Sequence, residues 1–207
     1  GVVTGSIAAT SLASLSGLST ASDDVITITV NDAGGNVDAT DLSALGAKTA
    51  GTVTVSNAVN IQGTTSEVTD ALVTDASLVV ANSATVEISN ASTVAELNAI
   101  AAKTNGVVTG SIAATSLASL SGLTTVGTDV ITITVNDGNG DGLSATDLST
   151  LGGKTAGTVT VSNAVVISGT TSQVTDALVT DSSKVTASTA LVTITDGAGN
   201  VDATDLS

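Results

Sequence analysis

Apolar and polar residues alternate along several short runs of the chain. Alternation with a period of two occurs in Ile26-Thr-Ile-Thr-Val30, in Val53-Thr-Val55 and in Val86-Glu-Ile88. This period is typical of a strand that buries one face, and Thr, Val and Ile suit a half-buried pleated surface. The pattern therefore predicts strands at these runs and at their copies near residues 130 and 158.

The segments after these strands have a different spacing. Val94, Leu97 and Ile100 are three positions apart within residues 92–106, and Thr93 with Glu96 fits a capping box. This spacing predicts a short helix. Similar but weaker patterns predict short helices within residues 11–15, 40–45 and 66–73.

The chain also repeats on a larger scale. Residues 1–18 return unchanged at residues 106–123, and Thr-Val-Thr-Val-Ser-Asn-Ala occurs at residues 52–58 and again at 158–164. We therefore expect two repeats, residues 1–105 and a nearly complete second repeat over 106–207, in one continuous array. Because the chain opens and stops within a repeat, we expect it to be a segment of a longer protein.

Strand-like runs begin at intervals of roughly 22–33 residues, which is the range of solenoid coils. A unit of one strand and one short helix cannot bury its apolar face alone, so neighbouring units must stack. We predict a right-handed parallel solenoid of strand, loop and short helix, with coils of about 26 residues. The alternative is an all-β parallel β-helix, in which the predicted helices would be strands and turns.

Composition narrows the possible functions. The chain has no aromatic residue, Cys, Met, Pro or His, and its formal net charge is −15 with only four basic residues. Nucleic acid binding is excluded because phosphate contacts require Arg and Lys clusters, and no apolar run is long enough for membrane insertion. Without an ordinary base and nucleophile pair, we expect no enzyme. A carbohydrate-active β-helix enzyme with paired carboxylates is the remote alternative.

An acidic, glycine-rich loop at residues 136–148 is the strongest candidate site. Its alternating Asp and Asn residues resemble the calcium loop of dockerin modules and EF-hands, in which side-chain oxygens surround a hard cation. The resemblance implies a calcium site formed by Asp137, Asn139, Asp141 and Asp147. Asp147 departs from the family, because it stands at position 11 of the loop where a Glu is expected at position 12.

Two related loops are weaker candidates for calcium and lack the alternating pattern. Their candidate ligands are Asp32, Asn36, Asp38 and Asp41 in one loop, and Asp196, Asn200, Asp202 and Asp205 in the other. In the alternative interpretation, Asp and Gly only form tight turns, and helices are capped by Thr40, Asp41, Thr146 or Asp147.

Pairs of Thr residues form a second pattern on the solvent side of the predicted strands. These Thr-x-Thr pairs are Thr27/Thr29, Thr52/Thr54, Thr132/Thr134, Thr158/Thr160 and Thr193/Thr195. Stacked coils would align them into an array that resembles the flat Thr faces of β-solenoid ice-binding proteins. Thr is also simply a favourable residue on an exposed strand face.

Taken whole, the chain resembles the giant, aromatic-poor repeat proteins of the bacterial cell surface, those of marine cyanobacteria in particular. The resemblance rests on residues 52–58, on 86–100 and on Ala-Thr-Asp-Leu-Ser-Ala-Leu at 39–45. It implies an extracellular structural, adhesive or motility-associated role in calcium-rich surroundings.

Our leading hypothesis is a structural repeat segment of a large secreted cell-surface or filament protein, a stiff acidic rod stabilised by calcium. Its partners would be neighbouring repeats or copies of itself, joined end to end. The alternative is an adhesin or binding module for a polysaccharide, a cell surface or ice. A glycan array would separate these two hypotheses.

Overall fold

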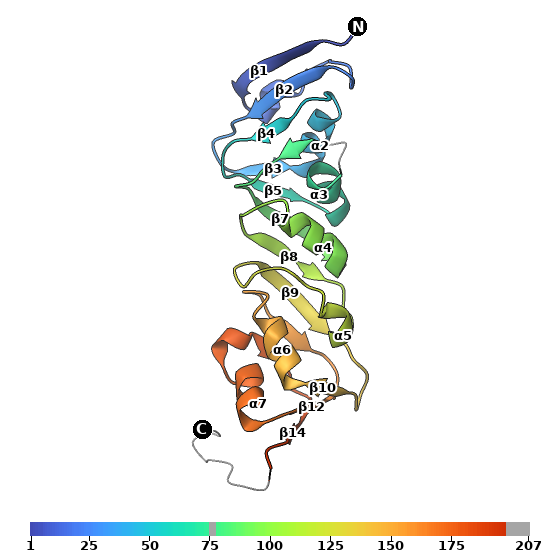
Figure 1. Ribbon diagram of the computed structural model, residues 1–207, viewed down its shortest axis with the longest axis vertical. Helices are drawn as coiled ribbons and strands as arrows, with labels where there is room; N and C mark the ends of the chain where they lie inside the picture. Colours follow the sequence, from blue (N-terminus) through green and yellow to red (C-terminus); the bar gives the residue numbers. More distant parts are fainter. Residues whose placement is uncertain (75–77, 198–207) are drawn as a thin grey trace. The chain divides into compact units, whose positions relative to one another are not determined.

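The computed structural model describes residues 1–74 and 78–197, and short strands alternate with short helices along the chain (Figure 1). The chain divides into two compact units. Unit 1 consists of Gly1–Ser92 with Glu96–Gly110, and unit 2 of Thr93–Ala95 with Ser111–Ser207. In each unit the strands pair mainly in parallel, and the helices contain at most eight residues.

Unit 1 contains two rows of parallel strands. The first row is, in order, β1 (Thr4–Thr10), β2 (Val25–Val30), β4 (Val53–Val55) and β6 (Val79–Val80). The second row is β3 (Asn36–Asp38), β5 (Asn60–Gly63) and β7 (Thr85–Ser92), and β8 (Val108–Ile112), which begins in this unit, follows β7. Paired residues are about 25 positions apart from β2 onward in the first row and from β3 to β7 in the second, so each of these strands pairs with its equivalent in the next segment. The pairing of β1 with β2 is shorter, because Thr4 pairs with Val25.

Unit 2 repeats this arrangement. One row is β9 (Val130–Val135), β11 (Val159–Val161) and β13 (Val185–Thr186), and the other is β10 (Gly142–Ser144), β12 (Val166–Gly169) and β14 (Leu191–Ile194). The registers match those of unit 1, because Ile133 pairs with Val159 as Ile28 pairs with Val53. The mainly parallel β architecture is therefore confirmed separately in each unit.

Seven short α-helices lie among the described residues, together with the 3-10 helix η2 (Asp181–Ser183). They are α1 (Leu12–Leu15), α2 (Ala39–Gly46), α3 (Thr65–Leu72), α4 (Val94–Ala101), α5 (Leu117–Leu120), α6 (Ala145–Gly152) and α7 (Thr171–Leu178). The predicted helices are thus present as helices. Reciprocal hydrogen bonds between Thr64 and Glu67 begin α3, and Thr170 and Gln173 begin α7 in the same way.

The core consists of columns of small aliphatic side chains that repeat from strand to strand. Val37, Ile61 and Val86 stand in register on β3, β5 and β7, and all three are buried. Such columns need no aromatic residue, because each Val or Ile packs on the equivalent side chain of the next strand. The sequence without aromatics is therefore compatible with a continuous, thin core.

Thr residues form part of the predicted rows on the opposite strand face. Thr193 does not belong to them, because it lies on β14 in the other row of unit 2 and pairs with Ser168. Thr29 pairs with Thr54, and Thr134, Thr160 and Thr186 are in register on three successive strands. In unit 1 the row stops after Thr54, whose next partner is Val80.

The strand runs that the sequence predicts at residues 53–55 and 86–88 are not neighbours in one row, because β6 pairs with β4, and β7 pairs with β5. The second row of strands was not visible in the sequence because β3 and β5 are short and carry one apolar residue between polar neighbours. A strand of this kind gives no recognisable alternation.

Candidate functional site

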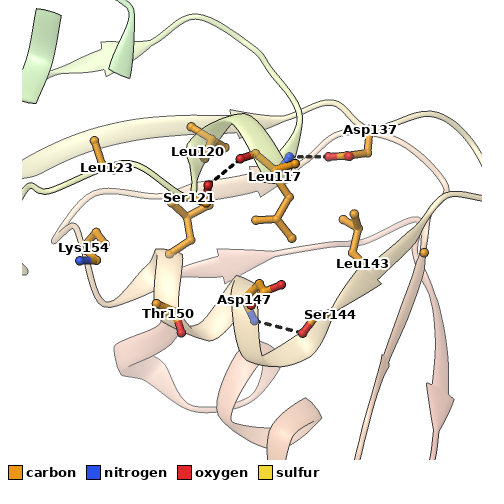
Figure 2. Close-up of a pocket in the computed structure, with 13 residues that line it drawn as sticks. Leu117, Leu120, Ser121, Leu123, Asp137, Leu143, Ser144, Asp147, Thr150 and Lys154 are labelled. Atoms are coloured by element: carbon orange, nitrogen blue, oxygen red, sulfur yellow. Dashed lines mark hydrogen bonds between the residues drawn. The ribbon is translucent and has the colours of Figure 1, made fainter. Parts of the chain in front are cut away.

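Each unit contains a hollow beside one of the acidic loops. The α5–α6 hollow has a volume of about 490 Å³, and the equivalent α1–α2 hollow in unit 1 about 420 Å³. Figure 2 shows Leu117, Leu120 and Leu143 along the α5–α6 hollow, with Asp137, Asp147 and Lys154 around its edge. α5 has only four residues, whereas the neighbouring α6 has eight. The short α5 therefore leaves part of α6 uncovered, and the hollow lies there.

The first acidic residue of each loop holds a helix of the preceding segment. The Leu117 N–H at the start of α5 donates to Asp137 Oδ2 at 2.7 Å (Figure 2), and in unit 1 the Leu12 N–H donates to Asp32 Oδ2 at 2.8 Å. The first N–H groups of a helix lack partners within the helix, and a carboxylate there is stabilised by the helix dipole. We call this contact the inter-segment clamp.

The same clamp recurs further along both units. Asn90 Oδ1 accepts the N–H and the hydroxyl of Thr65, and Asp196 Oδ2 accepts the N–H and the hydroxyl of Thr171. The hydroxyl of Thr171, and then its N–H, hold the pKa of Asp196 below its ordinary value of 3.8. Thr65 and Thr171 are the first residues of α3 and α7, so four helices begin at a clamp.

Two further candidate ligands of the strongest loop also accept backbone N–H groups. Asn139 Oδ1 accepts from Ala164 at 3.0 Å, and Asp141 Oδ2 accepts from Gly138 at 2.7 Å. Gly140 has a φ of 83°, a conformation in which a residue with a side chain would be strained. These contacts make a tight turn at the tip of the loop.

The structure only partly brings the four candidate calcium ligands together. Asp137 and Asp147 line the α5–α6 hollow, whereas Asn139 and Asp141 belong to the turn and are not among its lining residues. Within residues 1–74 and 78–197, no three His, Cys, Asp or Glu side chains are grouped so that they could hold a metal ion. Calcium binding by this loop stays a prediction that would require rearranged side chains.

The weaker candidates in unit 1 lie closer together. Asp32, Asn36, Asp38 and Asp41 all line the α1–α2 hollow. Two of them already bind neighbouring side chains, because Asn36 Oδ1 accepts from Asn60 Nδ2 at 3.1 Å and Asp38 Oδ1 accepts from Gln62 Nε2 at 3.0 Å. These hydrogen bonds join the side chains of β3 to those of β5. The acidic rim can attract cations, and its polar groups also join adjacent strands.

In the third loop only Asp196 can be placed, and it forms the clamp to Thr171. Asn200, Asp202 and Asp205 lie outside the described residues.

The predicted helix caps are two or three residues too late. The N-cap of α6 is Ser144, whose hydroxyl accepts from the Asp147 N–H at 3.3 Å, and the N-cap of α2 is Asp38. Thr40, Asp41, Thr146 and Asp147 lie inside the first turns of these helices. The caps were misplaced because β3 and β10 end directly at the helix starts, with no loop between them.

Sequence reasoning missed a second recurring contact. Lys-Thr-x-Gly occurs at residues 48–51, 103–106 and 154–157, each time shortly after a helix. The buried Thr155 hydroxyl accepts the N–H groups of Ile131 and Gly157, both at 2.8 Å, and donates to Ile131 O or Asp129 O. Thr49 makes the equivalent contacts in unit 1. The threefold recurrence of the motif was the signal that could have revealed it.

In the described part of the chain, no helix combines the length and the apolar character that a bilayer span requires. Comparison with known proteins finds no matching family model, no matching curated protein and no matching solved structure.

Removing a clamp should weaken the fold moderately. We expect Asp137→Ala to lower the free energy of unfolding by about 1 kcal/mol, because the first N–H of α5 loses its acceptor. Asp137→Asn should retain most of the stability, because an amide oxygen can take the place of the carboxylate in a clamp. Asn90 does so in unit 1, where its Oδ1 accepts from the Thr65 N–H at 2.7 Å. Urea unfolding followed by circular dichroism measures both. Asp23→Ala, at an exposed position, is the control, and an equal loss there would contradict the clamp.

Two carboxylates should make the free energy of unfolding depend on pH in the acid range. The N–H and then the hydroxyl of Thr64 hold the pKa of Glu67 below its ordinary value of 4.5, and the pKa of Asp196 is lowered as described above. Both carboxylates therefore stabilise the fold above about pH 4.5, and this contribution is lost as pH falls through the lowered pKa values. The double variant Glu67→Gln, Asp196→Asn should reduce the slope of the unfolding free energy against pH in the acid range. The reduction should correspond to at most about two fewer protons taken up on unfolding.

The two units supply the controls for this measurement. Gln173 stands at the position of Glu67 and Asn90 at the position of Asp196, and both form the same hydrogen bonds without titrating. The reverse variant Gln173→Glu, Asn90→Asp should therefore steepen the dependence between pH 5 and pH 3. An unchanged slope in both variants would show that these carboxylates do not contribute to acid sensitivity.

Proposed function

We propose that this chain is a structural repeat segment of a large secreted cell-surface or filament protein. In this proposal the two units continue one another as a right-handed parallel solenoid with coils of about 26 residues. The observation that carries it is the pairing of equivalent strands about 25 residues apart, in the same registers in both units. A repeat that pairs with its own next copy can be extended without changing its geometry.

The contacts between successive segments favour a rigid chain. Successive segments are joined by strand pairing, by the aliphatic columns, by the clamps and by the buried Thr hydroxyls. Asn57 and Asn163 add side-chain amides that donate to the backbone carbonyls of Asp32 and Asp137 in the preceding segment. Each junction between segments thus has several independent bonds that oppose bending and separation.

The charge of the chain fits an exterior role in calcium-rich surroundings. A net charge of −15 keeps the surface soluble, and the acidic rims of both hollows raise the local concentration of cations. We propose that calcium binds weakly at these rims and at the loop of residues 136–147, in the millimolar class of extracellular modules. The resemblance to surface repeat proteins of marine cyanobacteria supports the same location.

The calcium proposal predicts a measurable stabilisation. Thermal unfolding with excess EDTA and then with about 10 mM calcium should show a gain on the order of 1 kcal/mol. The gain should be absent with magnesium and lost in Asp141→Ala. A calcium-independent transition would leave the acidic loops as turns and clamps only.

The location of the protein on the cell tests the proposed role as a secreted structural segment. Antibodies raised against the chain should label the surface of intact cells that produce it, and a protease added outside should remove the label. Electron microscopy of the labelled cells should show the antibody on a surface layer or on filaments. A label that appears only after lysis would contradict a secreted role.

The hollows favour one second candidate function, an adhesin that holds a ligand on this face. Each hollow combines a Leu-rich floor with carboxylates and a single Lys at its edge. Sugar stacking on aromatic rings is excluded by composition, so recognition would rest on polar and calcium-bridged contacts. Specific spots on a glycan array, lost in Leu143→Asp, would favour this function over a purely structural one.

A further inference from the structure

Each hollow lies beside a strand that pairs on one edge. β10 begins its row in unit 2, and no strand within residues 1–74 and 78–197 pairs with its other edge, which we call the free edge. All three residues of β10 line the α5–α6 hollow, and all three residues of β3 line the α1–α2 hollow in the same way. Figure 2 shows Leu117 of α5 and Leu143 of β10 on facing sides of the α5–α6 hollow.

The free edge of β10 follows from the order of elements within the chain. Residues 130–157 contain two strands, β9 and β10, whereas the preceding residues 106–129 contain the single strand β8 and the short helix α5. β9 pairs with β8, so β10 has no counterpart in the preceding segment. The space that a second strand of that segment would fill is therefore left beside β10, where the hollow lies.

The free edge presents backbone groups that can pair with another strand. The Val166 N–H on β12 donates to Asp141 O at 2.8 Å, and Leu143 O also faces β12. Because alternate residues of a strand direct their N–H and C=O groups to opposite edges, those of Gly142 and the N–H of Ser144 face the free edge. β3 has the equivalent register on β5 in unit 1.

The aliphatic column beside the free edge indicates which side chain fits there. Leu143 and Ile167 stand in register on β10 and β12, and both are buried. A residue that pairs opposite Leu143 on an added strand directs its side chain to the same face, toward the Leu residues of α5. Val or Ile in this place extends the column, and the two flanking side chains face outward.

The rim of each hollow carries an excess of negative charge. In unit 2 two carboxylates, Asp137 and Asp147, stand against one ammonium group, that of Lys154. The hollow of unit 1 is lined by three carboxylates and one Lys: Asp32, Asp38, Asp41 and Lys48. Charge complementarity therefore favours basic side chains on an added strand.

We propose that each hollow binds an extended peptide segment of a partner protein, which adds to the free edge as a parallel strand with the pattern basic, Val or Ile, basic. The apolar residue lies opposite Leu143, its N–H donates to Gly142 O, and its C=O accepts the Ser144 N–H. Volumes of about 490 and 420 Å³ are within the range of ligand sites. This inference rests on the second candidate function, for which it names the class of ligand.

An NMR titration of the isotope-labelled chain with the peptide acetyl-Thr-Lys-Val-Lys-Thr-amide tests the pairing. The amide signals of Gly142 and Ser144 in unit 2, and of Asn36 and Asp38 in unit 1, should shift and reach saturation. Methylation of the Val nitrogen should weaken binding by about tenfold or more, because the hydrogen bond to Gly142 O is lost. Methylation of the first Lys nitrogen, whose N–H points away from β10, should have little effect. Replacing both Lys by Glu should also weaken binding, because the rim is acidic.

A substitution at the free edge separates the two hollows. Gly142→Pro removes the N–H that faces the free edge and leaves the groups that face β12, so the shift at Ser144 should disappear while those at Asn36 and Asp38 remain. Gly142→Ala is the control and should bind like the unaltered chain, since a Cβ there would meet no atom within 4 Å. Circular dichroism should show that both variants keep the fold.

Two results would overturn the peptide strand as the ligand. One is the absence of shifts at all four amides, and the other is equal binding of the two methylated peptides. Glycan-array spots that are lost in Leu143→Asp, without binding of the peptide, would keep the adhesin function and assign the hollow to a glycan. Failure of the peptide proposal and failure of the adhesin function are therefore distinguishable.

Discussion

Gly157→Ala should destabilise the protein by about 3 kcal/mol, although it adds a single methyl group. A Cβ at this position would lie 2.4 Å from the carbonyl oxygen of Ile131, 2.7 Å from its carbon and 3.0 Å from its nitrogen. These are backbone atoms of β9, which cannot move aside without breaking the pairing of β9 with β11. Thermal unfolding followed by circular dichroism should show a midpoint lower by roughly 6–12 °C.

The matched control for this substitution is four residues away. Gly153 also lies near the end of α6, but a Cβ there would be 3.4 Å from its closest neighbour, Thr150 O, and its φ of −67° suits any residue. Gly153→Ala should therefore be neutral or slightly stabilising. Equal losses at both positions would show that the close approach of Gly157 to β9 is not what stabilises this junction.

Thr155→Val should cost about 2–3 kcal/mol, although the two side chains have nearly the same shape. The hydroxyl of Thr155 uses its full capacity of one donated and two accepted hydrogen bonds, all within a buried site. Val leaves the Ile131 N–H without its acceptor away from water, and buried groups without partners are costly. Urea unfolding should show a lower midpoint with an unchanged slope.

Thr132→Val makes the same chemical change on the exposed face of β9. Thr132 points to solvent, so its replacement should change the free energy of unfolding by less than about 0.5 kcal/mol. Thr49→Val, at the equivalent position of unit 1, should reproduce the loss at Thr155. A neutral Thr155→Val would mean that water replaces the hydroxyl and that the site is not dry.

Much of the local structure could be predicted because it depends on neighbours in the sequence. The strand at residues 26–30 and the helix at 94–101 follow from spacing alone, and both are present. The role of Asp137 could not be predicted in this way. Its partner, the Leu117 N–H, is twenty residues earlier, and only the folding of one segment against the next brings the two together.

The same limit explains the calcium interpretation. Asp137, Asn139 and Asp141 have the spacing of a metal loop, but spacing does not show which backbone N–H groups will approach each oxygen. One side-chain oxygen of each of the three residues accepts a backbone N–H from its own or a neighbouring segment. Thr155 was missed for the opposite reason, because a Thr in a polar turn resembles an ordinary surface residue until its burial is known.

The side-chain hydrogen bonds that join different segments have one further consequence, which concerns how such a chain grows in evolution. They connect residues about 20 to 30 positions apart, as between Leu12 and Asp32 or between Leu18 and Lys48. A gene duplication that inserts whole segments therefore breaks few contacts and recreates those it breaks. The unchanged recurrence of residues 1–18 at 106–123 fits this history, in which length changes freely while each new segment inherits a ready partner.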